Sequence, residues 1–257
     1  MKEQERFDLV YDIGETLLKN GAEIKRVELT ISHVAKAFQL DNFDSYVSIH
    51  GVFLTYQHQD STVRARVRDT PISPISLGRI DAINTLSRHI TEGKIGPEEA
   101  KTRLEAIKTE SYSSTRLKIL AFIFGSASFC YVFGGTLVDA AGALLLGGFL
   151  ALYTIYLIPK MKLSPIIIYV TSSFLVSILA SILVLLFPTL NLNMLITGGI
   201  IPLLPGVAIS NGIRALFDED YQSGWTQILF AVITAMSISI GVGMGILFSN
   251  YIWTVQL

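Results

Sequence analysis

Charged side chains are distributed very unevenly along this chain. The 257 residues include 20 Lys and Arg and 21 Asp and Glu, and only seven of these charged residues lie beyond Lys118. A water-soluble domain of that size would need a polar surface, whereas a lipid bilayer removes this need. We therefore expect residues 116–257 to be embedded in a membrane and residues 1–115 to form a water-soluble domain.

The apolar half divides into stretches that match the thickness of a bilayer. A spanning helix needs about 20 mostly apolar residues, and the longest uncharged stretch, 163–213, is interrupted at Pro188. We expect five spans, at about 118–137, 140–158, 165–187, 192–213 and 226–249. The predicted fold class is an α-helical polytopic membrane protein with an amino-terminal α+β domain.

Basic residues at the ends of the expected spans predict the orientation. Arg116 and Lys118 precede the first span, Lys160 and Lys162 lie in the second loop, and Arg214 follows the fourth span. The loops on the other side contain no Lys or Arg. Because basic residues are enriched on the cytoplasmic side, we expect a multi-pass protein of the plasma membrane with a cytoplasmic amino terminus and an external carboxyl terminus.

The fourth expected span carries the strongest sign of function. Pro202 and Pro205 lack a backbone donor and clash with the preceding turn, and nearby glycines weaken the helix further. Many transporters bind substrate at such a break, where the amino end of the second half-helix is partly positive and suits a carboxylate. We expect that half-helix to begin near Gly206. The candidate substrate-binding residues are Gly198, Gly199, Pro202, Pro205, Gly206, Ser210, Asn211 and Arg214.

Other interpretations of these residues remain open. The two prolines are also compatible with a purely structural kink, and Arg214 is as well suited to anchoring the helix end at the inner interface as to attracting anions. Asp139 is the only carboxylate between the first two spans, and we expect it in the outer loop. If protons drive transport, Asp139 or a residue of a partner is the coupling candidate.

The first 115 residues predict an α+β domain with a small antiparallel sheet. Apolar residues recur at helical spacing in two segments that Asn20-Gly21 separates, and alternation typical of strands follows them. The second helical pair begins after a proline-containing loop and includes Pro97 in a first turn. The expected helices are 3–19, 23–39, 76–92 and 97–110, and the expected strands are 44–50, 52–57 and 62–68.

The sequence predicts neither an enzyme nor a cofactor or metal site. The four histidines lack metal-ligand spacing, and no HExxH, phosphate-binding loop or nucleophile elbow occurs. The first 118 residues carry 17 basic and 17 acidic side chains, so no nucleic-acid partner is expected. Arg64, Arg66 and Arg68 share one face of a strand, which indicates either a solvated face or a contact for an acidic ligand.

Several stretches in both halves of the chain form a set of motifs. In the soluble part they are Gly21-Ala-Glu-Ile-Lys-Arg-Val-Glu28, His50-Gly-Val-Phe-Leu-Thr55, Leu77-Gly-Arg-Ile-Asp-Ala-Ile-Asn84 and Gly93-Lys-Ile-Gly-Pro-Glu-Glu-Ala100. In the membrane part they are Phe133-Gly-Gly-Thr-Leu-Val-Asp139, Leu204-Pro-Gly-Val-Ala-Ile-Ser-Asn-Gly-Ile-Arg-Ala-Leu216 and Tyr221-Gln-Ser-Gly224. In their order and spacing, these stretches resemble the motifs of the threonine/serine exporter family. The chain departs from the first of these motifs at Glu23, where many members have Ser or Thr.

The resemblance implies a secondary exporter for a small carboxylate-bearing metabolite, either threonine, serine or a dicarboxylate such as succinate. It also implies the split type of this family, in which a second small membrane subunit supplies the remaining spans of a hetero-oligomer. The residues that match the family motifs of the cytoplasmic domain are Gly21, Ala22, Arg26, Glu28, Gly51 and Thr55.

Two functions from other classes remain alternatives. A membrane-anchored sensor or scaffold would bind a partner through its soluble domain, although a simple anchor needs only one span and no broken helix. A membrane-anchored hydrolase would need a nucleophile held beside a base, and the sequence offers no clear pair.

Overall fold

The chain forms two compact units in the computed structural model, Met1–Ser113 and Ser114–Leu257. The structure describes every residue except 41, 50, 58–62, 70–74 and 254–257. For residues 63, 64, 67–69 and 253 it describes the backbone but not the side chain. Each unit has its own cluster of buried hydrophobic residues, and the two clusters share no member.

The amino-terminal unit combines helices with one antiparallel sheet, in the strand order β1-β2-β3. Its predicted helices and strands are present, with ends that differ by up to two residues from the expected ones. The described elements are α1 (Glu3–Lys19), α2 (Ile24–Ala37), β1 (Phe43–Ser48), β2 (Gly51–Gln57), β3 (Val63–Asp69), α3 (Leu77–Thr91) and α4 (Pro97–Thr109).

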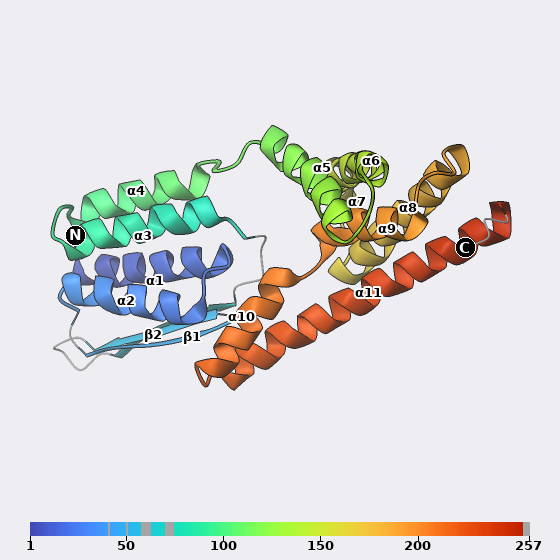
Figure 1. Cartoon of the computed structure of the whole chain (residues 1–257). Coiled ribbons are helices and arrows are strands. Elements are labelled where there is room, and N and C mark those ends of the chain that lie inside the picture. Colours follow the sequence, from blue (N-terminus) through green and yellow to red (C-terminus); the bar gives the residue numbers. More distant parts are fainter. Residues whose placement is uncertain (41, 50, 58–62, 70–74, 254–257) are drawn as a thin grey trace. The chain divides into compact units, whose positions relative to one another are not determined.

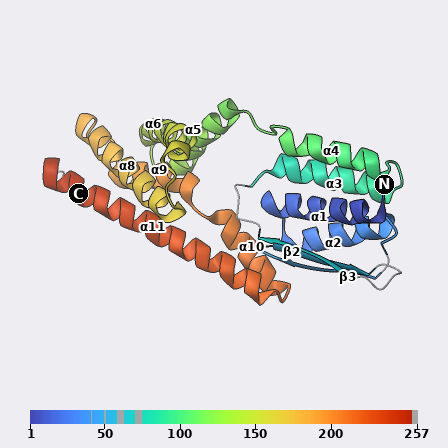
Figure 2. The same cartoon turned by 180° about the vertical axis from the view of Figure 1, so that it is seen from behind.

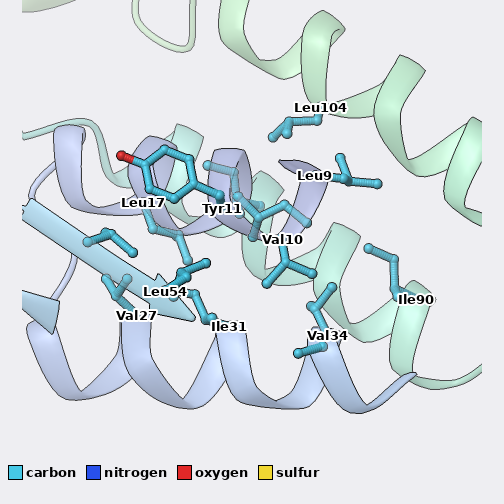
Figure 3. Close-up of a cluster of buried hydrophobic side chains, with 14 of the residues drawn as sticks. Leu9, Val10, Tyr11, Leu17, Val27, Ile31, Val34, Leu54, Ile90 and Leu104 are labelled. Atoms are coloured by element: carbon cyan, nitrogen blue, oxygen red, sulfur yellow. The ribbon is translucent and has the colours of Figure 1, made fainter. Parts of the chain in front are cut away.

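Three layers build this unit: the sheet, the pair α1 and α2, and the pair α3 and α4 (Figures 1 and 2). The middle layer has neighbours on both sides, which explains why α1 is buried around most of its circumference. Figure 3 shows the resulting core, in which Val10 and Leu17 of α1 lie near side chains from α2 and β2. On β2, Val52, Leu54 and Tyr56 are buried while Phe53 is exposed, as the alternation of a strand requires.

The carboxy-terminal unit is entirely helical over its described residues. The helix α5 ends earlier than its hydropathy indicates, because Gly134 adopts a positive φ and Gly135 N donates to Cys130 O at 3.0 Å. The elements are α5 (Thr115–Val132), α6 (Leu137–Leu152), a π-helical turn (Tyr153–Leu157), α7 (Ile158–Met161), α8 (Pro165–Leu186), α9 (Leu192–Ile200), a 3₁₀ turn (Ile201–Leu203), α10 (Gly206–Phe217) and α11 (Tyr221–Trp253).

Four helical segments among the described residues are long and apolar enough to cross a membrane, or five if the bent pair α9 and α10 counts as one span. The last segment is longer than expected, because α11 has 33 residues and begins at Tyr221 rather than near residue 226. At 1.5 Å per residue it extends about 50 Å, well beyond a hydrocarbon core of about 30 Å.

Small residues bring the apolar helices into close contact. A β-carbon added at Gly147 of α6 would lie 2.6 Å from Phe122 O of α5, and one at Gly245 of α11 would lie 2.9 Å from Phe174 O of α8. One added at Gly241 of α11 would collide with Ser173 Oγ and Val170 O of α8. These glycines therefore set the distance between helices, as expected where lipid provides no hydrophobic drive for association.

A matched pair of glycines on α11 tests this packing. We expect Gly241→Ala to destabilise the protein by about 1–3 kcal/mol, because its methyl group would push α11 away from α8. Gly243 has no atom within 4 Å of the corresponding position. Gly243→Ala should therefore leave stability unchanged or raise it by up to about 1 kcal/mol. Thermal unfolding of both variants in detergent measures the difference, and equal unfolding midpoints would contradict it.

Candidate functional site

The fourth apolar segment is interrupted between α9 and α10. The helix α9 ends at Ile200, a 3₁₀ turn covers Ile201–Leu203, Leu204 is extended, and α10 begins at Gly206. The two helices differ in direction by 58°. The break and the start of the second half-helix lie where the sequence predicted them.

The two prolines account for the interruption. Pro202 has no N–H group, so the carbonyl of Gly198 loses the donor that a continuous helix would supply. Pro205 has none either, and the carbonyl of Ile201 instead accepts a hydrogen bond from Leu204 N at 3.0 Å. The chain thus closes one tight turn and then starts a new helix.

The amino end of α10 has no side-chain cap, because the residue in the capping position is Pro205. Gly206 N donates to Leu204 O at 2.9 Å, and Ile209 N donates to Pro205 O at 3.1 Å. The amides of Val207 and Ala208 belong to the first turn, where no carbonyl of the same helix can reach them. This end of α10 therefore carries partial positive charge and free donor capacity.

Some of the predicted site residues lie together on the first turns of α10. Ser210 Oγ donates to Gly206 O at 3.0 Å, so the hydroxyl group is tied to the helix backbone. The half-buried carboxamide of Asn211 has no hydrogen bond to any residue that the structure describes. Of these two polar side chains, Asn211 is therefore the better placed to bind a ligand.

The glycines of α9 have a different environment from the break. A β-carbon at Gly198 would lie 2.6 Å from Cys130 Cβ and 2.8 Å from Ser126 O of α5. One at Gly199 would lie 2.7 Å from Val176 Cγ1 of α8. Both glycines are buried where α9 packs on neighbouring helices, so the structure places them in the helix bundle and accounts for them by packing.

Arg214 lies in the last turn of α10, not next to the break. Its exposed side chain is eight residues from Gly206, about 12 Å along the helix axis. Beside it, Gly212 packs on α11, where a β-carbon would lie 3.1 Å from Gly224 O. Arg214 therefore belongs to the opposite end of α10 from the free amides.

The prediction that Asp139 lies in a loop is wrong. The helix α5 ends at Val132 and α6 already begins at Leu137, so Asp139 lies in the first turn of α6. Only 2% of the surface of Asp139 is exposed. One carboxylate oxygen accepts hydrogen bonds from Thr136 N at 2.8 Å and Thr136 Oγ1 at 2.7 Å. The other accepts one from Asn191 N at 2.7 Å, immediately before α9.

Thr136 and Asn191 are the site residues that the sequence analysis missed. Thr136-Leu-Val-Asp139 has the spacing of a capping box, in which the first and fourth residues bond to each other's backbone. Asn191 caps α9 by accepting from Asn193 N at 3.0 Å and Met194 N at 3.3 Å. The capping-box spacing was a usable sequence signal, but the bond between Asp139 and Asn191 joins residues 52 positions apart and has no local signal.

The motif residues of the amino-terminal unit mostly shape its backbone. Gly21 follows α1 with a φ of 78°, and Ala22 N donates to Leu17 O at 3.1 Å, which closes the helix end. Gly51 and Thr55 are paired positions of β2. The remaining motif residues, Arg26 and Glu28, lie on α2, where Glu28 is 3.6 Å from Lys25.

One of the three predicted strand arginines forms a charged cluster with α1. Arg66 lies 2.7 Å from Asp8 and 3.3 Å from Asp12, and its guanidinium is 4.3 Å from the centre of the Tyr11 ring. The side chains of Arg64 and Arg68 are outside the described part of the structure. The pKa of Asp12 is raised, mainly by burial and also by the nearby carboxylates of Glu15 and Asp8, although Lys108 and Arg66 lower it.

No group of three His, Cys, Asp or Glu side chains within the described residues is arranged to hold a metal ion. His50 and His58 fall outside those residues. The groups that remain available at the break are backbone amides and uncharged polar side chains, which bind ligands by hydrogen bonds and partial charge.

Long apolar helices joined by close glycine contacts, with one interrupted pair, define the class: a polytopic α-helical membrane protein. The chain matches the threonine/serine exporter (ThrE) family over residues 8–249 and belongs to that family. The description of the family is that of an exporter, which is a transporter rather than an enzyme. No solved structure matches the chain.

Three curated relatives illustrate the range of the family. A threonine/serine exporter of Corynebacterium glutamicum is 32% identical over 146 residues, which are 55% of this chain and 28% of the relative. An uncharacterized protein of Schizosaccharomyces pombe is 23% identical over 94% of this chain and 32% of its own length. Pheromone-regulated membrane protein 10 of Yarrowia lipolytica is 21% identical over 89% of this chain and 19% of its own length. The chain thus spans less than a third of each of these relatives.

The environments of the glycines predict different effects of the same substitution. We expect Gly198→Ala to lower stability by about 1–3 kcal/mol, because the added methyl group would collide with the backbone of α5. Gly206→Ala should leave stability nearly unchanged, because nothing lies within 4 Å of its added atom. Thermal unfolding in detergent distinguishes them. A larger loss for Gly206→Ala would show that the α9 glycine does not fix the packing.

Asp12 predicts a pH effect in the amino-terminal unit. Its raised pKa means that the folded unit binds this proton more tightly than the unfolded chain does. The contribution of Asp12 therefore favours folding at low pH and is lost as pH rises through its folded-state pKa. The α1 amides of Asp12→Asn should therefore be better protected from hydrogen exchange than those of wild type, and this difference should grow as the pH is raised from 4 to 7. The exposed Asp44→Asn serves as control, and a parallel gain there would contradict the assignment.

Proposed function

We propose that this chain is a subunit of a secondary exporter for small carboxylate-bearing metabolites, either threonine and serine or a dicarboxylate such as succinate. The observation that carries the proposal is the interruption between α9 and α10, where a new helix starts inside an apolar segment. Transporters use such half-helix ends as binding sites for anionic groups. The name of the Corynebacterium relative supports an amino-acid substrate.

The proposed substrate path runs along the first turns of α10. The amides of Val207 and Ala208 supply donors and partial positive charge for a carboxylate. The Asn211 carboxamide follows about 5 Å further along the helix axis, and an amide both donates and accepts hydrogen bonds. It is therefore suited to the second polar group of the substrate, whether an ammonium, a hydroxyl or another carboxylate. Arg214 is proposed to attract anions towards this path from the far end of α10.

The distribution of basic residues supports a location in the plasma membrane, with the amino-terminal unit on the cytoplasmic side. Arg116 and Lys118 lie at the start of α5, and Lys160 and Lys162 lie at or just after α7. If α9 and α10 together cross once, Arg214 is on the same side as these four residues. The carboxyl terminus is then outside.

A second membrane subunit is proposed as the partner. This chain matches at most about a third of the length of each relative. The remaining two thirds of the relatives are long enough to contain further spans. An odd number of five spans also fits one part of a transporter better than a whole one. The partner would be a small protein with several spans that co-purifies with this chain from detergent extracts.

Efflux measurements on two variants test the proposed path. We expect Asn211→Ala to reduce export of the substrate about tenfold, the effect of losing one hydrogen bond to a charged group. Pro205→Ala restores a backbone N–H group and should reduce export by favouring a straighter helix. Cells loaded separately with serine, threonine and succinate identify which compound is exported.

Gly243→Ala is the matched control, because its added methyl group meets no neighbour. It should export at the wild-type rate. If both Asn211→Ala and Pro205→Ala also export every compound at the wild-type rate, the path does not lie along α10.

A further inference from the structure

Asp139 joins the starts of two helices that are distant in sequence. Its carboxylate accepts two hydrogen bonds from Thr136, at the start of α6, and one from Asn191 N, at the start of α9. Leu195 of α9 packs against Gly142 of α6, where an added β-carbon would lie 2.7 Å from Leu195 Cδ2. The carboxylate and this close packing together hold the first arm of the interrupted pair against α6.

The bonds that Asp139 makes depend on its negative charge. An ionised carboxylate only accepts hydrogen bonds, and the backbone N–H groups of Thr136 and Asn191 can only donate. A protonated carboxyl group donates one hydrogen bond through its new O–H, and its oxygens are weaker acceptors than those of a carboxylate. Neutralising Asp139 therefore weakens the bond from Asn191 N, which joins α6 to α9, together with the bonds from Thr136 that hold the carboxylate at the start of α6.

The surroundings of Asp139 make its charge sensitive to the position of α9. The side chain is buried, and within the described residues no Lys, Arg or His forms an ion pair with it. Among the residues that the structure describes, the Cys130 thiol of α5 is a titratable group that lies within electrostatic range of the Asp139 carboxylate. The carboxylate is instead balanced by the amino ends of α6 and α9. If α9 moves away, the buried charge loses part of this balance.

We propose that Asp139 is a positioning residue that latches α9 to α6 while it is ionised, and that its protonation releases this arm. By linkage, release of α9 and proton binding then favour each other. The inference deepens the proposed function, on which it rests, because it links a proton to the helix that leads into the proposed substrate path. It commits Asp139 to controlling the position of α9 rather than to contacting the substrate.

The single cysteine of the chain provides a reporter of the latch. Cys130 is fully buried, and its Cβ lies 2.6 Å from where a β-carbon of Gly198 on α9 would be. If α9 leaves α6 and α5, the Cys130 thiol becomes accessible to a maleimide. The labelling rate at one fixed pH therefore reports on α9 without any transport measurement.

The test compares the full-length protein in detergent with Asp139→Asn, Asp139→Glu and Thr136→Val. We expect Asp139→Asn to label at Cys130 about tenfold faster than wild type at pH 7, the equivalent of one hydrogen bond to a charged group. Asp139→Glu keeps the charge and should stay close to wild type, while Thr136→Val should be intermediate. Glu219→Gln, which neutralises an exposed carboxylate in the loop after α10, should label like wild type.

A second measurement follows the pH profile of efflux in cells. Wild type and Asp139→Glu should show an export rate that changes with pH, and Asp139→Asn should show a flattened profile. Equal Cys130 labelling in wild type, Asp139→Asn and Thr136→Val would overturn the latch, whatever the proteins transport. Faster labelling in these variants without export of any tested compound by wild type would support the latch and overturn the proposed function. If Asp139→Asn does not fold, Thr136→Val and Asp139→Glu decide the question.

Discussion

A backbone polar group cannot be left without a partner inside a bilayer, and this constraint shapes the fourth apolar segment. Pro202 and Pro205 remove two donors that a continuous helix would use. The chain forms a tight turn at Ile201–Leu203 and a new helix start at Gly206, so the carbonyls of Ile201, Leu204 and Pro205 accept hydrogen bonds while first-turn amides remain available. The interruption of the helix therefore leaves the backbone donors that we propose as the binding place for an anion.

The arm before this break is held in place along its length. Gly198 and Gly199 let α9 approach α5 and α8 closely, and the start of α9 is bonded to Asp139 of α6. The first turns of α10, in contrast, have an open glycine and an uncapped end. The interrupted pair therefore combines a firmly packed half with a half whose polar groups remain accessible.

The amino-terminal unit is built differently, because it contains most of the charged side chains of the chain. Its helices α1 and α2 are buried between the sheet and the pair α3 and α4, and its charges form partly exposed pairs such as Arg66 with Asp8. Pairs of this kind contribute little to stability. The family motif at Gly21 is explained by a helix end that requires a positive φ. At this position, the resemblance to the family therefore reflects a requirement of the backbone.

The sequence alone determined the membrane character of the second half, the positions of most elements and the break at Pro202–Pro205, because charge content, periodicity and proline act locally. Only the tertiary structure decided which polar groups meet. Asp139 changed from a loop residue to a buried bridge because Gly134 ends α5 early and Asn191 arrives from 52 positions further along the chain. Gly198 and Gly199 changed from candidate binding residues to packing contacts because their neighbours come from α5 and α8. A single sequence records the local rules of each segment, but contacts between distant segments form only when the helices pack.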